Sequence, residues 1–135
     1  MKKYVILQIM FTILVAACSN YVYDLRGKFD ESVTKYNSLY RWNELDKAGL
    51  FVADPIRDAF MARTKESKNV KIVEYRILSI QYDGEMRKAT VETEIDYYLA
   101  STSRMKTLRD TQEWAYIEQR GIKGWRLLSL VPEFK

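Results

Sequence analysis

Three patterns of hydrophobic and polar positions follow one another along the 135 residues of the chain. The first is an apolar run over residues 4–17, interrupted only by Gln8 and Thr12. From Phe29 the apolar residues recur every three or four positions, which is the spacing of an amphipathic helix. From Val70 they recur mainly at alternate positions, the spacing of a half-buried strand. This order predicts a separate N-terminal segment, then helices, then a sheet.

The helical part divides into segments predicted over residues 29–42, 44–51 and 54–65. The first has its apolar stripe at Phe29, Val33, Tyr36 and Tyr40. The third begins at Asp54, whose carboxylate suits an N-cap, and Pro55 suits the first helical position, where its missing N–H costs nothing. Three short helices are therefore expected before the sheet.

The strand-like part predicts four strands, over residues 70–82, 88–99, 105–118 and 125–131. In the first strand the apolar parity shifts near Ile77 and Leu78, which indicates a β-bulge. Asp83-Gly84 is a strong hairpin signal. The second strand alternates best, with one face formed by Ala89, Val91, Thr93, Ile95, Tyr97 and Leu99 and the other by Lys88, Thr90, Glu92, Glu94 and Asp96. An antiparallel meander is expected.

Helices followed by antiparallel strands make an α+β fold. We expect the N-terminal helices to pack in the concavity of a curved antiparallel sheet, over Val91, Ile95 and Tyr97. The domain organisation predicted from the sequence is a signal peptide over 1–17, a tether over 18–28 and one α+β domain over 29–135.

The N-terminal segment has the three parts of an export signal. Lys2 and Lys3 give the positive start, and the apolar run that follows ends in small residues. A membrane-spanning helix takes roughly 20 apolar residues, and the run over 4–17 is shorter. A cleaved signal is therefore favoured over a permanent transmembrane helix.

The end of this run, Val15-Ala16-Ala17-Cys18, resembles the lipobox of bacterial lipoproteins. The resemblance implies that a diacylglycerol joins the Cys18 thiol and that Cys18 becomes the first mature residue. Two or more acyl chains hold a protein stably on a membrane. Ser19 resembles the outer-membrane sorting pattern, so the expected location is the cell envelope, on the outer membrane and facing the periplasm. The alternative is an ordinary buried thiol near a cleavage site.

Charge and composition exclude several classes of function. Loss of Lys2 and Lys3 with the signal leaves 20 basic against 18 acidic residues, a net charge of +2, and these charges are interleaved along the chain. Nucleic-acid binding, which uses a clustered basic stripe, is not expected. The chain has no histidine, so histidine-based triads and histidine metal ligands are absent. No metal or cofactor motif is present, and none is predicted.

A few residues could carry chemistry or recognition. Asp96 lies beside tyrosines, and a carboxylate next to phenols can act as a general base; Glu113 is a second candidate carboxylate. Asp96 shares its parity with Glu92 and Glu94, so a solvated face, paired with Lys106 and Arg109 across the sheet, is the favoured interpretation. The candidate ligand or interface residues are Arg76, Tyr97, Trp114 and Trp125.

For these candidates a structural role is the competing interpretation. Arg76 could instead be a structural ion-pair partner of Asp46, Asp58 or Glu113. Trp114 and Trp125 are interpreted first as core residues. The stretch over residues 114–117 is apolar on both faces, which raises the hypothesis of a homodimer.

The element order and the ending Gly124-Trp125-Arg126-Leu127-Leu128, followed by Pro132 and Phe134, resemble the nuclear transport factor 2-like (SnoaL-like, cystatin-like) cone fold and its small uncharacterised envelope lipoproteins. The resemblance implies a ligand pocket at the open end of the cone. Some members are isomerases or dehydratases that use an Asp–His pair or an Asp with tyrosines. The lack of histidine leaves only the second arrangement.

Three functions follow as hypotheses. The favoured one is a non-catalytic binding or accessory module, anchored through its lipid, that docks an envelope protein partner or holds a small apolar ligand. The second is a small cone-fold enzyme that uses Asp96 with tyrosines. The third is a structural envelope protein that acts by self-association.

Overall fold

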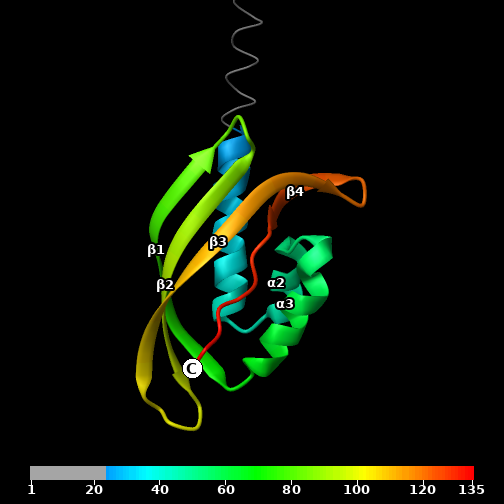
Figure 1. Ribbon diagram of the computed structural model, residues 1–135. Helices are drawn as coiled ribbons and strands as arrows, with labels where there is room; N and C mark the ends of the chain where they lie inside the picture. The colour runs from blue at the N-terminus through cyan, green and yellow to red at the C-terminus, as the bar shows by residue number, and fades with distance from the viewer. Residues whose placement is uncertain (1–23) are drawn as a thin grey trace, which may run out of the picture.

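The computed structural model describes residues 24–135, in which helices are followed by a four-stranded antiparallel sheet (Figure 1). The strand order is β1-β2-β3-β4, so each strand pairs with its neighbour in sequence. The strands are β1 (Val70–Asp83), β2 (Lys88–Leu99), β3 (Met105–Gln119) and β4 (Ile122–Leu127). The predicted α+β class and the antiparallel meander are confirmed.

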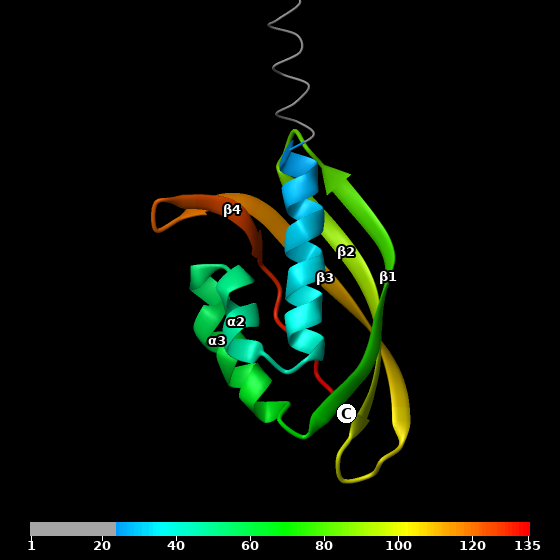
Figure 2. The ribbon, with the colours of Figure 1, turned by 180° about the vertical axis from the view of Figure 1, so that it is seen from behind.

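The helices lie on one face of the sheet, here called the inner face (Figure 2). Residues 24–41 are helical, and they are followed by α2 (Leu45–Ala48), a 3-10 turn η1 (Gly49–Phe51) and α3 (Asp54–Glu66). Both ribbon views place α2 and α3 beside helix 24–41, on the side away from β1. Within residues 24–135 no helix has the length and apolar character needed to cross a membrane.

Helix 24–41 includes residues 24–28, which the sequence had assigned to the tether, and that assignment is wrong for them. Leu25 is buried one helical turn before Phe29 and so extends the apolar stripe. Asp24 and Lys28 form an exposed ion pair at 2.8 Å within the same turn. The residues around Leu25 are mostly polar, so the sequence pattern did not predict this first helical turn.

The start of α3 differs from the prediction by one residue, because Ala53 is the N-cap and Asp54 lies in the first turn. The side chain of Gln119 takes over the capping role by accepting the Asp54 N–H at 2.7 Å. The Asp54 carboxylate instead pairs with Arg57 at 2.7 Å and with Arg120 at 3.1 Å. These contacts fix α3 to the β3–β4 hairpin.

The register of β1 against β2 shifts between Ile77 and Ser79, which confirms the predicted bulge, and also between Ile72 and Glu74. The hairpin at Asp83-Gly84 is confirmed, with residues 84–87 forming the turn.

The last strand was predicted wrongly, because β4 begins at Ile122 and ends at Leu127. Arg120 and Gly121 both have positive φ, 53° and 77°, and they complete the turn before Ile122. Gly124, which the sequence analysis left between two predicted strands, pairs with Ile117 inside the ladder. Residues 128–135 leave the sheet as an extended segment without helix or strand.

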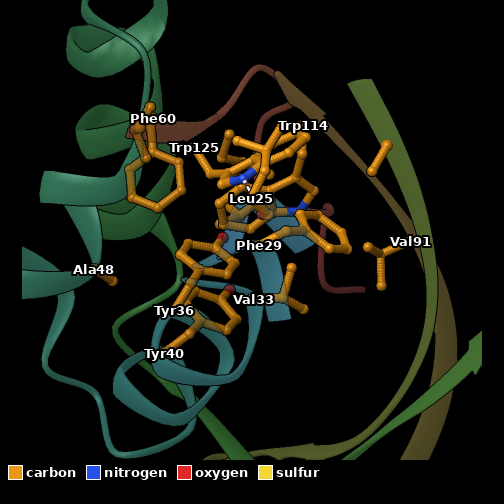
Figure 3. Close-up of a cluster of buried hydrophobic side chains, with 14 residues drawn as sticks. Leu25, Phe29, Val33, Tyr36, Tyr40, Ala48, Phe60, Val91, Trp114 and Trp125 are labelled. Carbon is orange, nitrogen blue, oxygen red and sulfur yellow. Dashed lines mark hydrogen bonds between the residues drawn. The ribbon is translucent and has the colours of Figure 1, made fainter. Parts of the chain in front are cut away.

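The core lies between helix 24–41, α3 and the inner face, and aromatic rings fill most of it (Figure 3). The Phe29 ring lies 4.9 Å from that of Trp125 and 6.4 Å from that of Trp114, both edge to face. Tyr36 contacts Trp114 at 5.6 Å and Phe60 at 6.3 Å. The predicted inward-facing residues of β2 are buried from Ala89 to Tyr97. Helix and sheet are therefore joined by one aromatic cluster.

Candidate functional site

The outer face of the sheet, away from the helices, carries a polar ladder centred on Arg76 of β1. Its guanidinium donates to Asp96 at 2.7 Å and to Glu94 at 2.8 Å, both on the neighbouring strand β2. Glu74 is a longer third partner at 3.4 Å. The expected partners Asp46, Asp58 and Glu113 are wrong, because the register places Arg76 opposite Glu94.

Threonines continue this ladder onto β3. Thr107 donates to Asp96 at 2.6 Å and Thr111 donates to Glu92 at 3.2 Å. Thr90 donates to Glu113, which is exposed, at 3.0 Å. The three acidic residues of β2 therefore lie on a polar outer face, as their parity predicted.

The environment of Asp96 is unlike that of a general base. The Arg76 hydrogen bond, and after it that of Thr107, lower the pKa of the Asp96 carboxyl below its usual value. A general base that works near neutral pH needs a raised pKa. The arrangement therefore does not favour the Asp96 hypothesis, nor that for Glu113 on the same face.

Replacement of Arg76 tests how much this ladder stabilises the fold. We expect Arg76→Met to lower the melting temperature by a few degrees at most at low salt, because exposed ion pairs contribute little and are screened. The difference should shrink in 1 M NaCl. Thermal melts of both proteins at two salt concentrations measure it, with Arg104→Met on the exposed turn as the matched control. A large, salt-independent loss would show that Arg76 has a packing role.

Trp114 and Trp125 both lie in the core and not at a surface. Their exposed fractions are 1% and 2%, and their indole N–H groups donate to Gln112 at 3.3 Å and to the Leu25 carbonyl at 3.1 Å. Ala115, next to Trp114, is also buried within the chain itself. The core interpretation of the two tryptophans thus fits their positions, and the homodimer remains a prediction.

A buried polar group, which the sequence analysis missed, lies on the inner face between helix 24–41 and β3. The side chains of Asn37 and Gln112 exchange hydrogen bonds at 2.7 and 3.3 Å. Asp110 has the same parity on β3 and pairs in register with the buried Thr93. Burial raises the pKa of the Asp110 carboxyl. Hydrogen bonds from Gln112 and from the Thr111 backbone oppose this effect, and the resulting pKa is about 6.

The signal for this group was the parity of Trp114, because alternate residues of one strand share a face. If Trp114 is inside, Gln112 and Asp110 are inside as well. Burial also raises the pKa of the two tyrosines of helix 24–41 nearest to it, Tyr36 and Tyr40. Asp110 is therefore the described carboxyl whose environment most favours its neutral form.

Tyr97 lies on the inner face toward the end of β2, two rungs beyond the pair formed by Thr93 and Asp110. Its ring meets Phe134 at 4.8 Å and its hydroxyl donates to the main-chain oxygen of Lys135 at 2.8 Å. Lys106, paired in register with Tyr97, donates to the same oxygen at 2.7 Å. Lys106 was expected to pair with carboxylates of the outer face, and that expectation is wrong because its parity places it inside.

A second surface feature lies where helix 24–41 ends. Trp42 is 69% exposed, and the Arg41 guanidinium lies 5.5 Å from the centre of its ring. Asn43 follows with a positive φ of 62°, which turns the chain sharply toward α2. A pocket of about 170 Å³ opens beside them, lined by Tyr40, Arg41, Trp42, Asn43, Leu45, Thr64, Ser67, Val70, Lys71 and Ile72. This set contains two cations and no carboxylate.

The four candidate residues are thus dispersed. Arg76 lies on the outer face, Tyr97 on the inner face toward the end of β2, and the two tryptophans in the core. Two residues that the sequence analysis did not select stand out instead. Trp42 is a tryptophan that is 69% exposed, and Asp110 is a carboxyl whose pKa is raised to about 6. Cys18 lies outside the described residues, so its lipidation remains a prediction. Among residues 24–135 no three Asp, Glu, Cys or His side chains are grouped closely enough to hold a metal ion.

Comparison with known proteins identifies a fold and not a family. No protein-family model matches the chain, and no curated protein matches it. It is similar to the solution structure of RPA3114, a SEC-C motif containing protein from Rhodopseudomonas palustris, with a TM-score of 0.54. The two share 16% sequence identity over 71% of this chain and 73% of that one. At this identity the likeness concerns the fold alone.

This match corrects the family assignment made from the sequence. The assignment to envelope lipoproteins with a nuclear transport factor 2-like domain is wrong, because the structural likeness is to a SEC-C motif protein. The assignment rested on element order and on a loose ending around Gly124 and Pro132. Helices followed by a meander are shared by many folds, and Pro132 lies in no strand of this one.

Proposed function

We propose that this protein is a non-catalytic binding module that docks a partner protein at the cell envelope. The observation that carries the proposal is the exposed Trp42 beside its pocket, which together we call the Trp42 corner. Tryptophan and arginine are the residues that most often dominate the energetics of protein interfaces. A tryptophan left 69% exposed next to a concave surface has both the side chain and the shape for such a contact.

The charge of the Trp42 corner indicates the chemistry of the partner. Arg41 and Lys71 are the charged residues of the pocket lining. A segment with an apolar side chain for the pocket and carboxylates on either side would be complementary. Partner docking is better supported than a small apolar ligand, because Phe29, Trp114 and Trp125 occupy the interior where such a ligand would bind.

The proposed location is the outer membrane, with lipidated Cys18 as the anchor and the domain facing the periplasm. Only five residues separate Cys18 from Asp24, the first described residue. We also propose that the sheet curves around the helices, which pack in its concavity. The support for this shape is the shared core of helix 24–41 and the inner face.

The test places a photo-reactive amino acid at position 42 and irradiates the native cells. We expect a discrete crosslinked product whose yield falls at least about tenfold in a Lys71→Glu background, because reversed charge would repel an acidic partner. The matched control places the same group at Ile122, which is 64% exposed on the β3–β4 hairpin and away from the corner. Equal crosslinking from both positions, or none from position 42, would refute docking at this site.

A further inference from the structure

Strand β1 forms a long edge of the sheet. In the strand order β1-β2-β3-β4, β1 pairs with another strand on one side only. Between Lys71 and Asp83, no part of the described chain outside the sheet shares a backbone hydrogen bond with it. Figures 1 and 2 show α2 and α3 on the other side of the molecule. The unpaired N–H and C=O groups of such an edge are a template for a further strand.

The opposite edge, at β4, is partly covered by the chain itself. Val52 forms an isolated bridge with Leu127 at the end of this strand. The Ala53 N–H also donates to the Leu127 carbonyl at 2.9 Å. β4 has six residues, whereas β1 has 14. The long edge open to a new strand is therefore β1.

Apolar side chains are exposed in the middle of this edge. Val73, Ile77 and Leu78 are large apolar residues whose side chains are exposed, and all three lie within residues 73–78. Val73 and Leu78 are the extra residues at the two register shifts of β1 against β2. Burial of these side chains by a second strand would remove apolar surface from water and so favour association.

Two opposite charges lie between these bulges. Glu74 and Arg76 pair in register with Asp96 and Glu94, so both side chains lie on the outer face. Arg76 contacts the two β2 carboxylates at 2.7 and 2.8 Å, whereas Glu74 reaches Arg76 at 3.4 Å and its side chain is 56% exposed. Tyr75, between them, has the opposite parity and lies on the inner face. Because the charges flank Tyr75 with opposite sign, this triplet is complementary to a reversed copy of itself.

The charges select one antiparallel register between two copies of β1. A two-fold axis at Tyr75 places Glu74 of each copy opposite Arg76 of the other, so two ion pairs form across the axis. It also places Val73 opposite Ile77. An axis at Glu74 or at Arg76 would instead place two like charges directly opposite each other, which is destabilising. An axis between two neighbouring residues would set outward-facing side chains against inward-facing ones.

We propose that β1 pairs antiparallel with β1 of a second copy of this chain, about a two-fold axis at Tyr75, so that the two sheets join into one. The bulges at Val73 and Leu78 bend the strand and confine the pairing to the residues around this axis. This surface is distinct from residues 114–117, on which the homodimer hypothesis from the sequence rested. The pairing goes beyond partner docking at the Trp42 corner and does not depend on it, although the two surfaces meet at Ile72.

The first test is a disulfide that this register permits at one position of the strand. Tyr75→Cys places a thiol opposite its own copy at the axis, where the Cβ atoms of directly opposite residues lie about 4.5–5.5 Å apart. After oxidation of the full chain with copper phenanthroline in a mild-detergent extract, we expect a disulfide-linked dimer on a non-reducing gel. The wild type, whose single cysteine is Cys18, gives the background.

The matched control is Ser79→Cys, which is exposed on the same strand. In the proposed register position 79 faces Lys71 of the second copy and lies more than about 20 Å from its own counterpart. Its dimer yield should therefore be at least about tenfold lower than that of Tyr75→Cys. Equal yields from the two variants, or no dimer from Tyr75→Cys above the background, would overturn the proposal.

Charge exchange provides a second, independent measurement. Glu74→Arg and Arg76→Glu each set like charges opposite each other in a dimer of one variant, so co-purification of two differently tagged copies should fall at least about tenfold. A mixture of the two variants restores both ion pairs and should restore co-purification. Arg104→Glu, on the exposed turn, is the matched control and should leave association unchanged.

Circular dichroism shows whether each charge variant folds. If Arg76→Glu does not fold, Glu74→Arg and the disulfide yields decide. Unchanged association in Glu74→Arg, or no recovery in a mixture of the two folded variants, would overturn the pairing. Because these measurements contain this chain alone, their outcome is separate from that of crosslinking at position 42.

Discussion

Trp114→Ala should cost about 3–5 kcal/mol of unfolding free energy, the range for removing a large aromatic side chain from a packed core. The side chain is 1% exposed and touches the rings of Phe29 and Tyr36 at 6.4 and 5.6 Å, so its loss opens a cavity between helix and sheet. It also removes the indole N–H that donates to Gln112, although Asn37 still binds that amide. Urea unfolding followed by circular dichroism measures the change.

Trp42→Ala is the matched control, because the same side chain is removed from a site that is 69% exposed. We expect it to change stability by no more than about 0.5 kcal/mol. The pair separates two roles for tryptophan in one chain, packing at position 114 and recognition at position 42. Similar stability losses in both variants would contradict this division and with it the proposal that the Trp42 side chain is free to meet a partner.

Most of the fold could be predicted because local patterns and tertiary burial agree. The alternation from Ala89 to Tyr97 placed β2 correctly, and the parity shift near Ile77 located a bulge. The errors fall where a tertiary contact outweighs a local signal. Leu25 is helical because its side chain is buried and its carbonyl binds Trp125, 100 residues away, and no local pattern contains that information.

The candidate sites were less predictable, since each depends on strand register or on distant segments. Parity placed Asp96 on the outer face, but only the register could identify Glu94 and Asp96 as the partners of Arg76. Residues of α3 and β1 line the pocket of the Trp42 corner, so its shape depends on packing that the sequence does not encode locally. The inward orientation of Asp110 could have been predicted, because Asp110 shares its parity on β3 with Trp114.

Asp110→Asn should stabilise the protein at neutral pH, which is unusual for a half-buried polar residue. Burial raises the folded-state pKa of Asp110 to about 6, and nearby Glu92 adds to the effect. In the unfolded chain the pKa returns to about 3.9. Between about pH 4 and pH 6 the folded state therefore holds more protons, so the free energy of unfolding falls as the pH rises through this window. Above about pH 6 the Asp110 carboxylate is ionised in the folded state, and its destabilising effect on the fold is then complete.

Asparagine has nearly the same shape, carries no charge and can still accept the hydrogen bond from Gln112. We therefore expect Asp110→Asn to be more stable than the wild type by about 1–2 kcal/mol at pH 7.5, since one pKa unit corresponds to about 1.4 kcal/mol and the group is partly solvated. The difference should vanish near pH 4, where both side chains are neutral. Urea titrations of both proteins at several pH values measure it.

Asp96→Asn is the control of opposite sign. The hydrogen bond from Arg76 lowers the Asp96 pKa, so its carboxylate stabilises the fold above about pH 4 and loses this effect as the pH falls. Asp96→Asn should thus be the less stable protein at neutral pH, and its difference from the wild type should also close on acidification. If instead Asp110→Asn were destabilised equally at pH 4 and pH 7.5, its carboxylate would be needed for packing whatever its charge. The inner face would then have no acidic group that favours its neutral form.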